Sequence, residues 1–134
     1  MTMKILVTED DDIGRRVLEL FLSPFGVCTS VGNGDVALAA IRESFTKGEP
    51  FDLVFLDIGL PGLNGLEVLE GIRACEKEFN CTKPLAVFML TGQTDGSVMK
   101  TARNLGAIGY VLKPVEESKL ISLLESKGFI QHSQ

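Results

Sequence analysis

Five short apolar runs along the chain alternate with longer stretches in which apolar residues recur every three or four positions. Short runs rich in β-branched and aromatic residues are typical of strands, and the longer period is typical of amphipathic helices. The third and fourth runs are apolar almost throughout, which indicates strands covered on both faces, as in a parallel sheet between helix layers. The predicted strands are 4–8, 27–31, 52–57, 85–90 and 109–112.

Helical spacing between these runs predicts five helices. Their apolar positions are Ile13, Val17, Leu20 and Phe21 in the first helix, Val36, Ala39, Ala40 and Phe45, expected to face inward, in the second, and Leu66, Leu69, Ile72 and Cys75 in the third. Proline and glycine set most of the ends, at Pro24 and Gly26, within 47–50, at Gly106 and at Gly128. The second helix is expected to begin at Asp35 and the third at Asn64 or Gly65, while the fourth and fifth cover about 95–105 and 115–126.

A strand followed by a helix, five times over, predicts an α/β protein with a doubly wound, five-stranded parallel sheet and helices on both faces. The length of 134 residues suits one domain. We expect that domain to cover 1–128 and a short C-terminal tail to cover 129–134. The sequence shows no internal repeat, and we expect no second domain within these residues, because no linker is followed by another set of elements.

Composition narrows the class of protein. The net charge of −5 argues against direct binding of nucleic acid, which requires a basic face. The apolar runs are far too short to span a membrane, and the amino terminus lacks the pattern of a secretion signal, so we expect a cytoplasmic protein. The three cysteines match no zinc pattern and are interpreted as small apolar residues, with a disulfide or redox role as the alternative.

Polar groups that suit chemistry follow the predicted strands directly. In an open parallel sheet, sites form beyond the carboxyl ends of the strands. Strand one leads into Glu9 and Asp10, strand three ends on Asp57, strand four leads to Thr91, and strand five to Lys113. Carboxylates gathered at one rim repel one another unless a cation neutralises them, and Mg²⁺ prefers such oxygen ligands. A carboxylate beside Mg²⁺ is also a suitable nucleophile toward phosphorus.

Each of these residues also has a plainer interpretation. Asp11 and Asp12 stand where a helix cap is expected, and Glu9 and Asp10 suit a solvated loop. Thr91 suits a helix cap too, and a lysine before a proline is common. The joint occurrence of these features favours the functional interpretation, because all of them fall at strand ends in the order that the fold needs.

Five signatures in order resemble the receiver domain of bacterial two-component response regulators, over essentially the whole chain. They are Glu9-Asp10, Asp57 followed by Leu60-Pro61 and Gly65, Thr91-Gly92, Gly109-Tyr110 and Lys113-Pro114. The resemblance implies a flavodoxin-like strand order of 2-1-3-4-5 and a signalling switch that is not an enzyme in the usual sense.

The resemblance also implies roles for individual residues. Asp57 would accept a phosphoryl group from a sensor histidine kinase or a histidine phosphotransfer protein, and would lose it slowly. Glu9, Asp10, Asp57 and the carbonyl of Gly59 would hold Mg²⁺. Lys113, expected to precede a cis proline, and Thr91 would bind the phosphoryl oxygens.

The expected output is a protein contact through the face formed by helix four, strand five and helix five. Tyr110 would be the aromatic switch on this face. Candidate contact residues are Val98, Met99, Arg103, Tyr110 and Leu112, with core filling as the alternative for Met99 and Leu112. Gly59 and Gln93 stand where family members tune the lifetime of the phosphoryl group, and the cognate kinase, target and oligomeric state stay open.

Three other classes of protein share features of this sequence. A phosphatase of the haloacid dehalogenase type needs an acid two residues after the nucleophile, where this chain has Gly59. A flavodoxin-like electron carrier needs a phosphate loop after strand one, where this chain has four acids, 9–12. A receiver-fold docking module that is never phosphorylated remains the main alternative.

Overall fold

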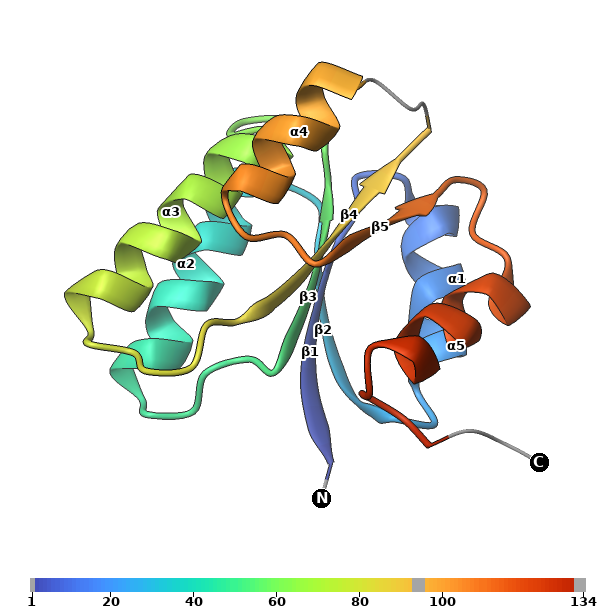
Figure 1. The fold of residues 1–134 in the computed structure, drawn as a ribbon, viewed down its shortest axis with the longest axis horizontal. Coiled ribbons are helices and arrows are strands. Elements are labelled where there is room, and N and C mark those ends of the chain that lie inside the picture. The colour runs from blue at the N-terminus through green and yellow to red at the C-terminus, as the bar shows by residue number, and fades with distance from the viewer. Residues whose placement is uncertain (1, 93–95, 132–134) are drawn as a thin grey trace.

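The computed structural model describes residues 2–92 and 96–131 as a parallel sheet between two layers of helices (Figure 1). The strands are β1 (Met3–Thr8), β2 (Gly26–Val31), β3 (Leu53–Asp57), β4 (Ala86–Thr91) and β5 (Gly109–Leu112). The helices are α1 (Asp12–Leu22), α2 (Gly34–Thr46), α3 (Gly65–Glu78), α4 (Gly96–Asn104) and α5 (Glu117–Ser126). The five predicted strands are confirmed with boundary shifts of a residue or so, and the expected start of the fourth helix lies outside the described residues.

The strand order is β2-β1-β3-β4-β5, which confirms the flavodoxin-like order. The register brings the strand ends level with one another. Thr8 of β1 pairs with Leu56 of β3, so the residues that follow them, Glu9 and Asp57, lie side by side. Thr91 pairs with Leu112 in the same way. Residues that are far apart in the sequence therefore meet at the carboxyl edge of the sheet.

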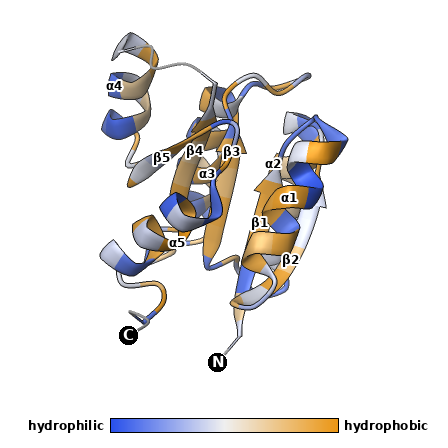
Figure 2. Ribbon diagram, turned by 90° about the vertical axis from the view of Figure 1, so that its right-hand side faces the viewer, coloured by the Kyte–Doolittle hydropathy of each residue, from blue (hydrophilic) through white to orange (hydrophobic). Residues whose placement is uncertain are grey.

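Two apolar clusters, one on each face of the sheet, form the core. Successive strand residues point to opposite faces, so Leu6, Val54 and Met89 contact one cluster while Val7, Phe55 and Leu90 contact the other. Figure 1 shows α2, α3 and α4 on the first face and α1 and α5 on the second. Figure 2 shows the central strands coloured as hydrophobic along most of their length, as expected of strands covered on both faces.

The buried face of α1 differs from the predicted apolar positions. Leu18 and Leu22 are fully buried, whereas Ile13 is 76% exposed and Leu20 is 67% exposed. Gly14 shares the face of Leu18 and Leu22, and a Cβ there would lie 3.1 Å from Asp11 and 3.3 Å from Glu9. The face without a side chain at Gly14 is therefore the one that can pack against the loop after β1.

The inner face of α2 was also predicted wrongly in part. Val36 and Ala39 are exposed, while Ala37 and Ile41 are buried together with Phe45, which was expected there. Both sets satisfy the helical period, but the observed face holds larger side chains and buries more apolar area. The helix begins at Gly34, capped by Asn33, one residue before the expected start.

The other helices agree with the prediction more closely. In α3, Leu69, Ile72 and Cys75 are buried, and Asn64 and Glu67 form a reciprocal capping box at its start. The α5 helix begins two residues later than expected.

Cys28, Cys75 and Cys81 are free thiols in the structure, so no disulfide joins them.

Candidate functional site

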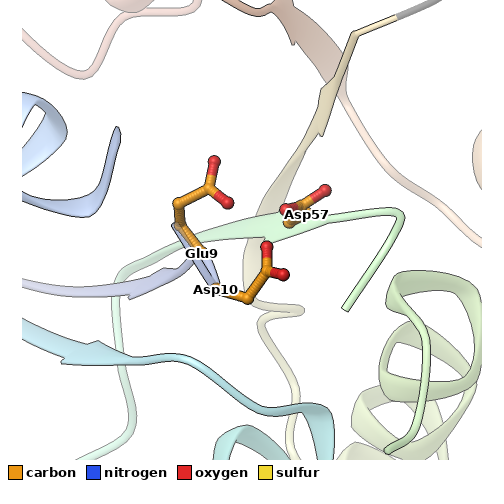
Figure 3. A group of neighbouring side chains, drawn as sticks. All are labelled: Glu9, Asp10 and Asp57. Atoms are coloured by element: carbon orange, nitrogen blue, oxygen red, sulfur yellow. The ribbon is translucent and has the colours of Figure 1, made fainter. Parts of the chain in front are cut away.

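Three acids meet at the carboxyl edge of the sheet, as the register requires (Figure 3). Glu9 and Asp10 follow β1, and Asp57 ends β3; a carboxylate oxygen from each lies within 4.8 Å of those of the other two. Glu9 is 1% exposed and Asp57 is 3% exposed, whereas Asp10 lies at the surface. Three oxygen donors so arranged are suited to a hard divalent cation such as Mg²⁺.

Lys113, which follows β5, bridges two of these acids. Its Nζ atom lies 3.1 Å from Glu9 Oε1 and 3.0 Å from Asp57 Oδ2. A single ammonium group thus neutralises part of the buried negative charge, which would otherwise be costly. The bond between Lys113 and Pro114 is cis, as expected.

Local hydrogen bonds hold the Asp57 side chain and backbone. The Asp57 amide donates to Thr8 Oγ1 at 3.1 Å, and that hydroxyl donates to the Phe55 carbonyl at 2.8 Å. The Gly59 amide donates to Asp57 Oδ1 at 3.0 Å. A Cβ at Gly65 would lie 2.5 Å from the Asp57 carbonyl oxygen, so α3 begins directly against this residue. The carboxylate at the end of an apolar strand is therefore fixed in place and not part of a loose loop.

Burial and hydrogen bonding separate the pKa values of the two buried acids. Burial, followed by the hydrogen bond with Asp57, raises the pKa of Glu9 to about 7. Burial alone would raise the pKa of Asp57, but hydrogen bonds with Glu9, the Gly59 amide and Lys113 outweigh it and lower that pKa. For Lys113, burial opposes the charged form, but both carboxylates raise the pKa of the ammonium group. The metal-free site thus favours an ionised Asp57, a protonated Lys113 and a Glu9 that holds its proton up to near neutral pH.

A cavity of about 400 Å³ opens beside Asp57. Its walls include Gly59, Thr91 and Lys113, together with Met99 from α4. Thr91 is 7% exposed at the end of β4, and the described part of α4 begins at Gly96. The cavity has room for a group larger than a carboxylate between Asp57, the ammonium group and the hydroxyl.

A second cavity, of about 300 Å³, lies between α4 and β5, where the switch residue was expected. Tyr110 borders it and is 46% exposed, and Met99 borders both cavities. Leu112 is also 46% exposed, which excludes core filling as its role in this conformation.

The structure brings together the three predicted metal ligands Glu9, Asp10 and Asp57, and it places Lys113 and Thr91 beside Asp57. Gln93 lies outside the described residues. Asp11, interpreted as a cap, is the N-cap of α1 and accepts from the Gly14 amide at 2.8 Å, and Asp12 lies in the first turn. Sequence reasoning missed the contributions of Thr8 and Arg15, which hold the backbone around the acids. No pattern of spacing marks either residue, because both act through backbone groups: Thr8 contacts a distant strand, and Arg15 reaches back six residues to the Glu9 carbonyl.

A family model described as the response regulator receiver domain matches residues 5–125. The chain therefore belongs to the response regulator receiver domain family, whose members are signalling switches of two-component systems and not enzymes in the usual sense.

Curated relatives support the same family. The chain is 34% identical over 128 residues to the DNA-binding response regulator MtrA of Mycolicibacterium smegmatis, covering 95% of this chain and 51% of MtrA. It is 31% identical over 123 residues to the transcriptional regulatory protein AruR of Pseudomonas aeruginosa, covering 91% of this chain and 48% of AruR. The chain thus spans about half the length of these relatives.

Solved structures of receiver domains are similar to this chain over nearly its whole length. The receiver domain of the histidine kinase CKI1 from Arabidopsis thaliana, complexed with Mg²⁺ and BeF₃⁻, matches with a TM-score of 0.78 and 26% identity, covering 92% of this chain and 90% of that chain. The chemotaxis response regulator CheY4 of Vibrio cholerae matches with a TM-score of 0.76 and 22% identity over 94% of this chain and 98% of that one, which shows the shared fold. In the part of this chain that the structure describes, no helix is both long and apolar enough to cross a membrane.

Proposed function

We propose that Asp57 accepts a phosphoryl group from a phosphohistidine of a sensor histidine kinase or a histidine phosphotransfer protein. The observation that carries this proposal is the position of Asp57. It is a buried carboxylate with a lowered pKa that borders an open cavity, with Lys113 Nζ at 3.0 Å. A carboxylate oxygen would form the bond to phosphorus while the bond from phosphorus to the imidazole nitrogen breaks, and the imidazole would take up a proton.

Glu9, Asp10 and Asp57 are the side chains proposed to hold Mg²⁺, with the Gly59 carbonyl as a further ligand. The donor set fits this ion, because it consists of oxygens from three carboxylates that lie close together. When bound, the ion supplies positive charge beside the phosphoryl oxygens. The receiver domain of CKI1 has been solved in complex with Mg²⁺ and BeF₃⁻, which supports the choice of ion.

Lys113 and Thr91 are proposed to bind the phosphoryl oxygens within the cavity. The Lys113 ammonium group, now paired with Asp57, would pair with a phosphoryl oxygen. The Thr91 hydroxyl would donate to another phosphoryl oxygen. Tyr110 would then turn toward the space that Thr91 leaves. Movement from mostly inactive to mostly active requires about 5 kcal/mol of differential interaction.

The proposed output is a protein target that binds the face formed by α4, β5 and α5. Three residues of this face are suited to report a change at Asp57. Met99 lines both cavities, Tyr110 lines the second cavity, and Leu112 is exposed to solvent. The domain would act in the cytoplasm without direct contact to nucleic acid or membrane, and slow hydrolysis of the acyl phosphate would reset it. Gly59, which has no side chain, would leave room for water beside the phosphoryl group.

Intact-protein mass spectrometry with a small-molecule phosphodonor tests the proposal. The mass should rise by one phosphoryl group in the presence of Mg²⁺, and neither the Asp57→Asn variant nor the wild type in chelator should show the gain. A folded, Mg²⁺-supplied wild type that gains no mass would contradict the proposal and favour a docking module that is never phosphorylated.

A further inference from the structure

Arg15, in the first turns of α1, reaches back over the acidic loop. Its Nη1 atom donates to the backbone carbonyl of Glu9 at 2.8 Å, and its Nη2 atom pairs with the Asp12 carboxylate. The side chain is 25% exposed, so most of it lies against the protein. The contact with Glu9 joins α1 to the loop that holds two of the three clustered acids.

The carbonyl that Arg15 binds belongs to the peptide group between Glu9 and Asp10. Other contacts already hold the rest of Glu9: its amide donates to the Val31 carbonyl at 3.0 Å, and its side chain accepts from Lys113 Nζ at 3.1 Å. The orientation of this peptide group determines the direction in which the next side chain, that of Asp10, leaves the backbone. Arg15 therefore acts on Asp10, the acid of the cluster that lies at the surface.

Gly32 provides the space through which the guanidinium group passes. A Cβ at this position would lie 2.9 Å from Arg15 Nη1 but 3.5 Å from the Glu9 carbonyl oxygen and 3.7 Å from the Asp10 Cα atom. The first distance is too short and the other two are ordinary contacts. A methyl group at Gly32 would therefore displace the guanidinium group while the backbone of the acidic loop has room to stay.

We propose that Arg15 is a positioning residue for the Mg²⁺ site, which orients Asp10 by holding the Glu9–Asp10 peptide group, and that Gly32 keeps its path open. This inference rests on the proposed function, because it assumes that the three acids bind Mg²⁺. Groups that orient metal ligands in this way commonly contribute tenfold or more to metal affinity.

The sign of the effect separates positioning from simple electrostatics. Arg15 is a cation close to a cation site, so the loss of its charge alone would strengthen Mg²⁺ binding. The loss of positioning would weaken it. Arg16 is the matched control, because it is an exposed arginine one residue further along the same helix.

The test is titration calorimetry of Mg²⁺ binding, without any phosphodonor, on the full chain and its variants. We expect Arg15→Ala to weaken binding about tenfold and Arg16→Ala to leave it unchanged. Arg15→Lys, which keeps the charge but lacks the planar fork, should recover only part of the affinity. Gly32→Ala keeps the arginine and should weaken binding, which provides a second route if Arg15→Ala does not fold.

Unfolding in urea with Mg²⁺ and with chelator supplies the second measurement. A merely structural role would lower both unfolding midpoints equally, whereas positioning should reduce the increase in the midpoint that Mg²⁺ causes. Mg²⁺ binding by Arg15→Ala that equals or exceeds wild-type binding would overturn the inference and leave the proposed function intact. A wild type that binds no Mg²⁺ would instead refute the metal site and, with it, the role of Arg15.

Discussion

At the scale of single residues, Glu9 controls how the acidic site responds to pH. Its pKa of about 7 in the metal-free protein lies above its ordinary value of 4.5, chiefly because of burial and then because of Asp57. The folded protein therefore keeps a proton on Glu9 between these two pH values, where the unfolded chain has lost it. The stability that this proton contributes is complete below about pH 4.5 and is lost as the pH rises through about 7.

Glu9→Gln tests this linkage, because glutamine cannot ionise. In chelator, the free energy of unfolding of the wild type should fall relative to Glu9→Gln by about 1–3 kcal/mol between pH 5 and pH 8. Urea unfolding of both proteins across this range measures the difference. Mg²⁺ should reduce the loss in the wild type at pH 8, because a bound cation favours the ionised carboxylate. Curves that run parallel across the pH range in chelator would contradict the raised pKa.

The main site residues were predictable because the register of a parallel sheet is simple. Glu9, Asp57, Thr91 and Lys113 each end or follow a strand, and the paired strands end level with one another. The contributions of Thr8 and Arg15 were not predictable, because each acts on a backbone group: Thr8 on that of a distant strand and Arg15 on that of the loop before its own helix. Such contacts depend on the distance between elements in the folded protein, and the hydrophobic pattern of the sequence does not determine this distance.

At the scale of elements, Arg73 connects α3 to two neighbouring segments. Its guanidinium group forms hydrogen bonds with the Leu105 carbonyl at 2.7 Å, after α4, and with Glu76 at 2.7 Å. Glu76 is 8% exposed and accepts from the Leu85 amide at 2.6 Å, just before β4. One ion pair thus joins α3, the start of β4 and the turn from α4 to β5.

Arg73→Ala should therefore destabilise the protein by about 2–4 kcal/mol, because it leaves a buried carboxylate without its cation. Arg42→Ala is the matched control: Arg42 pairs with Glu78 at 2.8 Å, but both side chains are half-exposed. Urea unfolding should show a clear loss for the first variant and none for the second. Equal midpoints for the two variants would show that the buried pair contributes no more than a surface pair.

The helices show why the ends of an element can be predicted from sequence more readily than the face that it buries. The starts of α2 and α3 follow from Asn33 and Asn64, and the end of α2 follows from Gly48; each residue acts within one turn. The buried face of α1 was not predictable from spacing, because Ile13 and Leu20 satisfy the helical period as well as Leu18 does. Only contact with the acidic loop, which requires the space at Gly14, selects between the two faces.

At the scale of the whole molecule, the core continues beyond the predicted end of the domain at residue 128. Phe129 packs edge-on against Phe88 of β4, with ring centroids 6.0 Å apart, and its amide donates to the Leu124 carbonyl at 2.9 Å. Ile130 also contacts the cluster that α1 and α5 cover. These contacts hold the segment after α5 against the sheet.

Two truncations measure what this segment contributes. Removal of everything after Gly128 should lower the free energy of unfolding by about 1–3 kcal/mol, because Phe129 and Ile130 lose buried apolar area. A truncation after Gln131 retains both side chains and is the reference. Mg²⁺ affinity should be the same for the two proteins, because Phe129 and Ile130, which only one of them retains, pack against the apolar cluster and not against the acids. Equal unfolding midpoints would place the end of the domain at 128, as first predicted, whereas a difference confined to stability would extend it to Ile130.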